Sequence, residues 1–206
     1  MTEQTRPYRK QRRAELEQAT RMRITESAVE LHGTLGPSRT SLSAIAERAG
    51  VRRSTLYRHF PDEAAVFAAC TAHWVASNPL PDLGAWATIG DPDERLRTAL
   101  HDLYAHYERT EGMMNNLVRD EETMPIVKEL FGGFRDYLTA GHLTLMRGRR
   151  ARGAARQRVS AATGHALAFT TWRSLVREQA LDSTQATDLM CRLATAAEGR
   201  PPRRPG

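Results

Sequence analysis

One stretch of the chain constrains the fold more than any other, and it reads SLSAIAERAGVRRSTLYRHF over residues 41–60. Ser41 is a residue type that caps helix N-termini, and Gly50 permits the positive φ that a sharp turn needs at little cost. Ile45 before the turn and Leu56 after it are apolar and spaced to face each other. The stretch therefore predicts two short helices, at 42–49 and 52–59, packed around a tight turn.

The rest of the chain is also patterned for helices. Apolar residues recur at spacings of three and four, and β-branched alternating runs are missing. We expect further helices at 18–32, 63–77, 91–109, 113–119, 125–147, 157–180 and 183–198, with a mobile basic loop at 148–155. The predicted fold is all-α, with a three-helix N-terminal head. The predicted division is a flexible basic arm at 1–17, a helix-turn-helix domain at 18–61, a larger helical domain at 62–198 and a disordered tail at 199–206.

Charge is distributed unevenly along the chain. Residues 1–60 hold 12 basic and 6 acidic side chains, and two later stretches are purely basic, with six arginines at 147–158 and three at 200–206. The remainder carries 9 basic against 18 acidic groups. A cationic head on an acidic body is typical of a protein whose head binds a polyanion. Chance clustering on a solvated surface is the alternative interpretation.

Composition argues against export and membrane insertion. No run approaches the ~18 consecutive apolar residues that a membrane span needs, and the N-terminus lacks the apolar core of a secretory signal. Cys70 and Cys191 are the two cysteines of the chain, so a disulfide framework is not expected. We therefore expect a cytoplasmic protein without a membrane partner.

Signals of enzymatic chemistry are weak. The sequence contains no Gly-rich phosphate loop, nucleophile elbow or paired-carboxylate arrangement. Three pairs come nearest to catalytic or metal-binding spacing: Cys70 with His73, His101 with His106, and Glu121 with Glu122. The first offers too few ligands for a closed zinc site, the second points to different helix faces, and the third is expected to be solvated charge in a turn. We expect no catalytic residues, no metal and no cofactor, and keep a helical enzyme as the less favoured alternative.

The stretch 41–60 resembles the DNA-binding motif of the TetR family of transcription regulators. The family pattern of Ile-Ala, Ala-Gly-Val and Leu-Tyr-x-His-Phe appears here, in order, as Ile45-Ala46, Ala49-Gly50-Val51 and Leu56-Tyr57-Arg58-His59-Phe60. The resemblance covers about residues 19–70. It implies a helix-turn-helix whose second helix enters the major groove, on a homodimer. One position departs from the family: a lysine that commonly meets a phosphate is replaced by Glu63, which a phosphate would repel.

The outward face of the second helix carries hydrogen-bonding groups and no acid. Arg52 and Arg53 have the guanidinium fork that binds guanine O6 and N7 together, while Tyr57 and His59 are expected to bind backbone phosphates. The full set of expected DNA contacts is Arg39, Ser41, Ser43, Arg52, Arg53, Ser54, Thr55, Tyr57, Arg58 and His59. The basic residues at 6–13 either enter an adjacent minor groove or add nonspecific attraction.

The larger domain is expected to bind a ligand and to form the dimer. The expected ligand residues are bulky and partly polar: Tyr104, Tyr107, Met114, Leu117, Phe134, Tyr137, Leu138, Phe169 and Trp172. The expected interface residues are Ala161, Gly164, Ala168, Thr171, Leu175, Leu189, Met190 and Leu193. Both sets have the alternative of plain intrachain core. The predicted function is a repressor that a small apolar or amphipathic ligand releases from a palindromic operator in double-stranded DNA, or alternatively a DNA-binding regulator controlled by a protein partner.

Overall fold

The computed structural model describes residues 5–199 of the chain, with side chains from Tyr8 onward. Within these residues every regular element is helical and no strand occurs, which confirms the predicted all-α fold. None of the helices in this part of the chain combines the length and the apolar character that crossing a membrane requires. The chain forms two compact units. Unit 1 comprises Met1–Pro79 and Gly112–Leu130, and unit 2 comprises Leu80–Glu111 and Phe131–Gly206.

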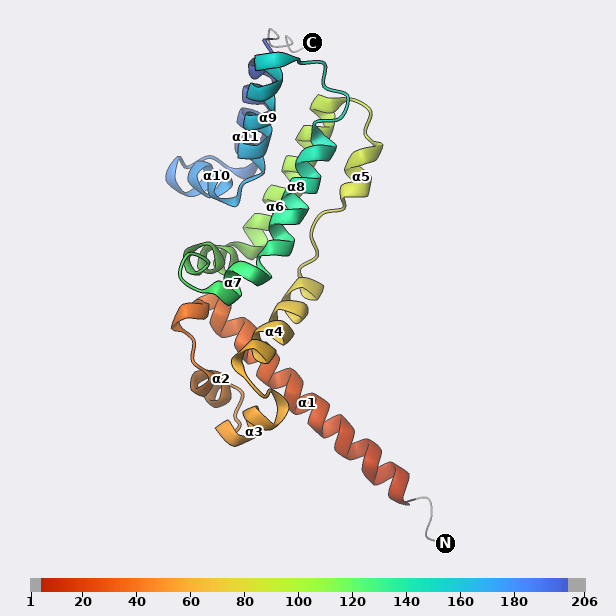
Figure 1. Cartoon of the computed structure of the whole chain (residues 1–206), viewed down its shortest axis with the longest axis vertical. Coiled ribbons are helices and arrows are strands. Elements are labelled where there is room, and N and C mark those ends of the chain that lie inside the picture. The colour runs from red at the N-terminus through yellow and green to blue at the C-terminus, as the bar shows by residue number, and fades with distance from the viewer. Residues whose placement is uncertain (1–4, 200–206) are drawn as a thin grey trace. The chain divides into compact units, whose positions relative to one another are not determined.

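Unit 1 is built on a long first helix. Its elements are α1 (Thr5–Thr34), the 3-10 turn η1 (Pro37–Arg39), α2 (Leu42–Arg48), α3 (Arg53–His59), α4 (Glu63–Ser77), the C-terminal end of α6 (Pro92–Asp120) and α7 (Pro125–Leu130). Helices α2 and α3 contact each other, and both contact α1 (Figure 1). The two short helices predicted around Gly50 are therefore present, as α2 and α3.

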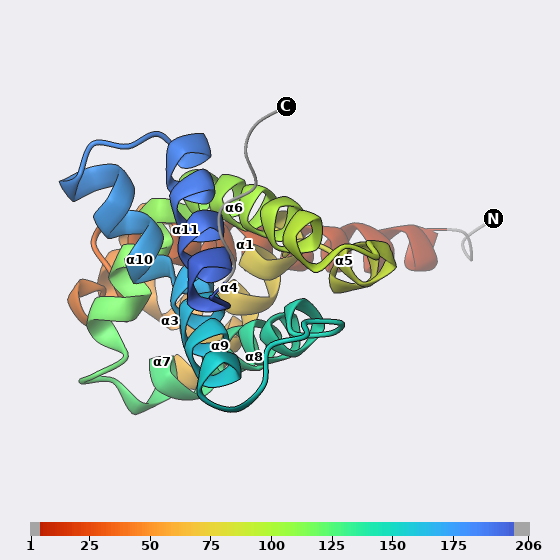
Figure 2. The ribbon, with the colours of Figure 1, turned by 90° about the horizontal axis from the view of Figure 1, so that it is seen from above.

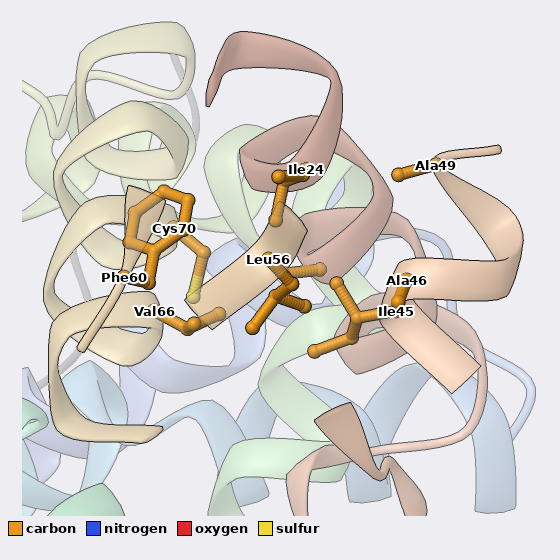
Figure 3. Close-up of a cluster of buried hydrophobic side chains, with 9 residues drawn as sticks. Ile24, Ile45, Ala46, Ala49, Leu56, Phe60, Val66 and Cys70 are labelled. Carbon is orange, nitrogen blue, oxygen red and sulfur yellow. The ribbon is translucent and has the colours of Figure 1, made fainter. Parts of the chain in front are cut away.

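The core of unit 1 holds α3 in place. Leu56 points from α3 into the centre of a cluster formed by α1, α2 and α4, next to Ile24 and Ile45 (Figure 3). Leu56, Ile24 and Phe60 are completely buried, and each such side chain contributes roughly 1.5–3 kcal/mol of burial free energy. The small Ala46, also buried, lets α2 approach its neighbours closely. This packing leaves the opposite face of α3 outside the core.

Unit 2 contains the remaining helices. They are α5 (Leu83–Thr88), the N-terminal part of α6, α8 (Gly132–Leu145), α9 (Gly153–Leu167), α10 (Phe169–Arg173), the π-helical turn η2 (Ser174–Glu178) and α11 (Ser183–Ala197). Helices α9 and α11 pack side by side (Figures 1 and 2). Asp182 and Gln185 form a capping box at the start of α11, which is the capping arrangement that fixes a helix N-terminus.

The helix predicted over 157–180 is interrupted at Ala168, which has extended backbone with φ −71° and ψ 134°. Two tyrosines of α6 form hydrogen bonds to the carbonyls just before this interruption. The hydroxyl of Tyr104 donates to the carbonyl of Ala166 at 2.9 Å, and that of Tyr107 donates to the carbonyl of Leu167 at 2.6 Å. Because these buried hydroxyls donate to the carbonyls at the end of α9, the helix can end there without leaving a buried carbonyl unpaired.

Two other helix boundaries differ from the prediction. Helices expected at 91–109 and 113–119 are one continuous helix, α6, and the helix expected at 125–147 is divided at Phe131 into α7 and α8. Gly112 lies within α6 at a point where a Cβ would come within 3.2 Å of the carbonyl oxygen of Gly33. The glycine thus serves close packing of α6 on α1 instead of ending the helix. The short helix α5 was not predicted.

The segments predicted as a flexible arm and a mobile loop contain helix or ion pairs in the described residues. Residues 5–17 of the expected arm belong to α1, since the segment is rich in strong helix formers and Arg13 pairs with Glu17 one turn away at 3.1 Å. In the loop expected at 148–155, the Arg149 side chain is 1% exposed and is paired with Asp93 and Glu198. Residues 1–4 of the arm and 200–206 of the expected tail lie outside the described residues.

Candidate nucleic-acid interface

The turn between α2 and α3 is closed by backbone hydrogen bonds. Gly50 has φ 64°, and its N–H donates to the carbonyl of Glu47 at 3.0 Å, while the N–H of Val51 donates to the carbonyl of Ala46 at 2.9 Å. This pair of bonds is the Schellman arrangement, which needs a residue in the left-handed region at the glycine position. The backbone therefore shows Gly50 in the role predicted for it, as the residue that permits the turn.

The outward face of α3 is exposed and free of acidic side chains. Arg52 is the N-cap residue of α3, and Tyr57 is 41% exposed. The ten expected DNA contacts divide into eight exposed residues (Arg39, Ser41, Ser43, Arg52, Arg53, Ser54, Tyr57 and Arg58) and two half-buried ones (Thr55 and His59). All ten belong to unit 1 and flank the turn or α3, so the arrangement suits a helix that enters a major groove.

Arg53 and Tyr57 form a pair on this face. The Arg53 Nη2 donates to the Tyr57 hydroxyl at 3.0 Å, and the guanidinium carbon lies 5.5 Å from the centre of the tyrosine ring. The tyrosine oxygen accepts from the arginine and keeps its own proton to donate. Such a pair holds a guanidinium fork in a restricted orientation, which lowers the entropy lost when it binds a base edge.

Arg21 of α1 secures the C-terminal end of α3, a role that the sequence analysis did not assign. Its Nη1 donates to the carbonyl of His59 at 2.5 Å, and its guanidinium lies 4.1 Å from the centre of the Phe60 ring. A cation at a helix C-terminus is favourable because it offsets the negative end of the helix dipole. The contact fixes where α3 ends relative to α1.

His59 is half-buried beside this contact. Burial lowers its pKa, and the positive charges of Arg58 and Arg21 lower it further, whereas Glu17 opposes them. Its Nε2 has no hydrogen-bond partner among the residues that the structure describes. At neutral pH the imidazole is therefore uncharged, and its unpartnered Nε2 is buried and not directed at solvent.

The N-terminus of α4 carries negative charge. Asp62 is its N-cap and accepts from the N–H of Ala65 at 2.8 Å, and the exposed Glu63 follows as the first residue of the helix. A free helix N-terminus attracts phosphate, but two carboxylates at this one repel it. Glu63 stands where the resembled family commonly has a lysine, and its carboxylate cannot donate to a phosphate.

The end of α6 holds the end of α1 through side chains to which the sequence analysis gave no role. Asn116 donates from Nδ2 to the carbonyls of His32 and Gly33 at 3.0 and 2.9 Å, and Asp120 accepts from the N–H of Ser38 at 2.9 Å. Burial by itself would raise the pKa of Asp120, yet hydrogen bonds from Arg119 and Ser38 lower it. These contacts give the start of η1 a defined position. Only three-dimensional proximity reveals them, because the partners lie more than eighty residues apart.

Cys70 is paired with His32 and not with His73, the partner considered in the sequence. The Cys70 sulfur lies 3.5 Å from His32 Nδ1, and the imidazole stacks on Phe67 at 4.8 Å. Burial lowers the pKa of His32 to about 4 and raises the pKa of Cys70 to about 11. The pair is therefore neutral and lacks a reactive thiolate. The described residues contain no group of three or more His, Cys, Asp or Glu side chains placed to hold a metal ion.

The residues expected to bind a ligand are largely packed against one another. Tyr107 lies at the centre of an aromatic cluster in unit 2, with ring centres 5.3 Å from Phe169, 6.0 Å from Trp172 and 6.3 Å from Phe134. Tyr104, Tyr107, Phe169 and Trp172 are buried, and Phe134, Tyr137 and Leu138 are half-buried. The other two, Met114 and Leu117, belong to unit 1.

Unit 2 has an open groove of about 830 Å³ between α8 and α9. Leu138 of the expected ligand residues lines it, together with Ala161, Gly164 and Ala168 of the expected dimer residues. Of the eight expected dimer residues, Ala161, Gly164, Leu189 and Leu193 are exposed, Ala168 and Leu175 are half-buried, and Thr171 and Met190 are buried. The predicted interface therefore includes both open positions and core positions.

Known proteins share this fold. The family model of the bacterial regulatory proteins of the tetR family matches residues 24–70. A TetR-like transcriptional regulator from Rhodococcus sp. RHA1 has 19% identity and a TM-score of 0.63, with 88% of this chain and 97% of that chain covered. The SmeT–triclosan complex has 24% identity and a TM-score of 0.59, covering 87% and 91%. The TetR-family regulator PfmR from Thermus thermophilus has 16% identity and a TM-score of 0.58, covering 87% and 99%.

A search of curated proteins finds no match. The family model covers the two short helices, the turn between them and the core that supports them, and the structures named above share the fold of both units. Residues 24–70 are therefore similar to the DNA-binding domain of the bacterial regulatory proteins of the tetR family, with α2 and α3 in the place of its helix-turn-helix, and the chain has the fold of TetR-like transcriptional regulators.

Proposed function

We propose that this chain is a homodimeric repressor that binds a palindromic operator through α3 and leaves it when a small apolar or amphipathic ligand binds. The observation that carries the proposal is the exposed, acid-free face of α3, anchored through Leu56 to a fully buried core. A helix with this face satisfies both requirements for major-groove recognition, namely donors at base edges and no charge that phosphates repel.

The roles of the residues follow from their chemistry. Arg52 and Arg53 read guanine, and each bidentate contact is worth roughly 1–3 kcal/mol of discrimination. Tyr57, which receives the hydrogen bond of Arg53 and keeps its own proton, donates to a backbone phosphate. Phosphate contacts position the helix without selecting sequence. The remaining expected contacts, Arg39, Ser41, Ser43, Ser54, Thr55, Arg58 and His59, complete this surface.

A dimer would place two such helices on two half-sites. Leu189 and Leu193 are 37% and 49% exposed on α11, and the small residues Ala161 and Gly164 are exposed on α9. Apolar side chains beside small residues permit close approach of a second copy. Half-sites about 34–36 Å apart, one turn of DNA, match a symmetric pair of recognition helices.

The ligand would act through unit 2. SmeT, which shares the fold, is known in complex with triclosan, and an aromatic, mainly apolar interior like that around Tyr107 suits a molecule of this type. A ligand releases DNA only if it binds one conformation of the protein more tightly than the other. A second candidate, control by a protein partner, is favoured by the complete burial of Tyr104, Tyr107 and Trp172, which fills the interior with side chains.

Selection of bound fragments from a random duplex pool tests the DNA-binding proposal. The wild type should enrich an inverted repeat, Arg52→Ala and Arg53→Ala should each relax the preference at one base pair, and Tyr57→Phe should weaken binding to all sequences alike. Arg150→Ala, which removes an exposed arginine between α8 and α9, is the matched control and should change nothing. Both arginine variants keeping the wild-type preference would refute the assigned readout.

A second selection separates the two modes of control. Repeating it in the presence of small apolar molecules should abolish enrichment for at least one of them, with a rise in the melting temperature of the protein, if unit 2 binds a ligand. Protein-partner control predicts no such rise with any small molecule.

A further inference from the structure

The N-terminal half of α1 is an exposed helix. Every described side chain from residue 8 to residue 19 is exposed, whereas the same helix is buried further on at Ile24 and Ala28. Figure 1 shows α1 running on past α3 toward the N-terminus. Burial in unit 1 therefore does not account for this segment.

The exposed segment is net basic, with four basic side chains against Glu15 and Glu17, and Arg13 pairs with Glu17 at 3.1 Å. Arg9, Lys10, Arg12 and Arg13 occur within residues 8–14, which contain no acidic residue. In a helix, residues at i, i+3 and i+4 share a face, so Arg9, Arg12 and Arg13 project together. This is a row of guanidinium groups suited to a line of phosphates.

The row points to the side of α1 on which α3 lies. Steps of three and four lead from Arg9 and Arg13 through Glu17 to Ile24, the residue that packs next to Leu56 of α3. The charges of Glu17 and Arg21 both act on His59 at the end of α3, and Arg21 bonds its carbonyl. A duplex bound by α3 thus lies on the side to which Arg9 and Arg13 project.

The local energetics of this segment do not favour a helix in isolation. The first turn of α1 has no acidic residue, and basic side chains near a helix N-terminus oppose the helix dipole. A helical segment without packing is marginal in water. Phosphates alongside would remove the charge repulsion and stabilise the helix.

We propose that residues 8–19 of α1 form a second DNA-binding surface, which contacts backbone phosphates flanking the base pairs read by α3. The segment is about 18 Å long, so it spans about five base pairs at 3.4 Å each. The inference rests on the proposed DNA binding of α3, and it adds phosphate contacts beyond the helix-turn-helix. It also supplies phosphate contacts in a chain whose α4 begins with the acidic residues Asp62 and Glu63.

The test compares wild type with a variant in which Arg9, Lys10, Arg12 and Arg13 are all replaced by alanine. Binding to the selected operator is measured as a function of salt, with hydroxyl-radical footprints on both. Each lost phosphate contact lowers the salt slope by about 0.9, and four contacts are removed on each of the two half-sites. We therefore expect a drop of about 7 for the dimer, a footprint shorter by about five base pairs per half-site, and unchanged base preference. Replacing Arg9, Arg12 and Arg13 by lysine should preserve the slope and the footprint.

The control variant replaces four exposed arginines of unit 2, Arg147, Arg150, Arg152 and Arg158, by alanine. It removes the same charge without touching α1 and should leave the footprint at wild-type length. An unchanged footprint in the α1 variant, or an equal drop of the salt slope in the control, would overturn the proposal while α3 still selects its operator. A wild-type chain that selects no sequence would instead overturn the proposed function and this inference with it.

Discussion

The buried His32 should make unit 1 sensitive to mild acid. His32 is 3% exposed, and burial lowers its pKa from 6.5 to about 4, with the charge of Asp120 opposing the shift. Between these two pH values the unfolded chain binds a proton that the folded chain does not. Stability is therefore complete above pH 6.5 and decreases as the pH falls toward 4. The loss is about 1.4 kcal/mol per pH unit between the two pKa values, reaching about 2 kcal/mol near pH 5, about 3 kcal/mol near pH 4 and at most about 3.4 kcal/mol at lower pH.

The variant His32→Gln provides the comparison, because glutamine keeps hydrogen-bonding groups but does not titrate. Urea denaturation followed by circular dichroism, at about pH 7.5 and about pH 5, should show that the wild type loses about 2 kcal/mol more than the variant does. Nuclear magnetic resonance of the His32 imidazole gives its pKa directly. Parallel losses in both proteins, or an imidazole that titrates near 6.5, would refute the reasoning.

Two further predictions concern the structure around the functional elements. Tyr107→Phe leaves the buried carbonyl of Leu167, now bonded at 2.6 Å, without its donor, and should cost about 1–3 kcal/mol in thermal unfolding. Gly50→Ala should cost about 1 kcal/mol, because its φ of 64° is unfavourable but nothing lies within 4 Å of the added Cβ. Gly36→Ala should cost more, since its φ is 98° and the Cβ would collide with Arg119. Equal melting temperatures for the two alanine variants would contradict the steric argument.

The helix-turn-helix was predictable because its determinants are local. Ser41 and Gly50 act on neighbours a few residues away, as cap and turn residue, and the helical spacing around Leu56 marks its inward face before its distant partners are known. The spacing of three and four residues reports helical faces without knowledge of the partner. The expected outward face of α3 followed directly, because the side opposite Leu56 has to face away from the core.

The interior of unit 2 was harder to predict because its determinants are not local. The sequence identified Tyr104 and Tyr107 as bulky, partly polar side chains, and both ligand site and plain core were open interpretations. Their hydroxyls bind carbonyls some sixty residues away, at Ala166 and Leu167. No local pattern in 157–180 shows that these carbonyls have donors, so a continuous helix was expected where the chain breaks.

The sequence by itself determined the helical class, the two short helices around Gly50 and the acid-free face beyond them, because periodicity and residue type act over a few positions along the chain. Only the tertiary structure decided that Arg149 is buried between Asp93 and Glu198 and that His32 is paired with Cys70. Both depend on partners distant in sequence, whose approach is set by the packing of whole helices.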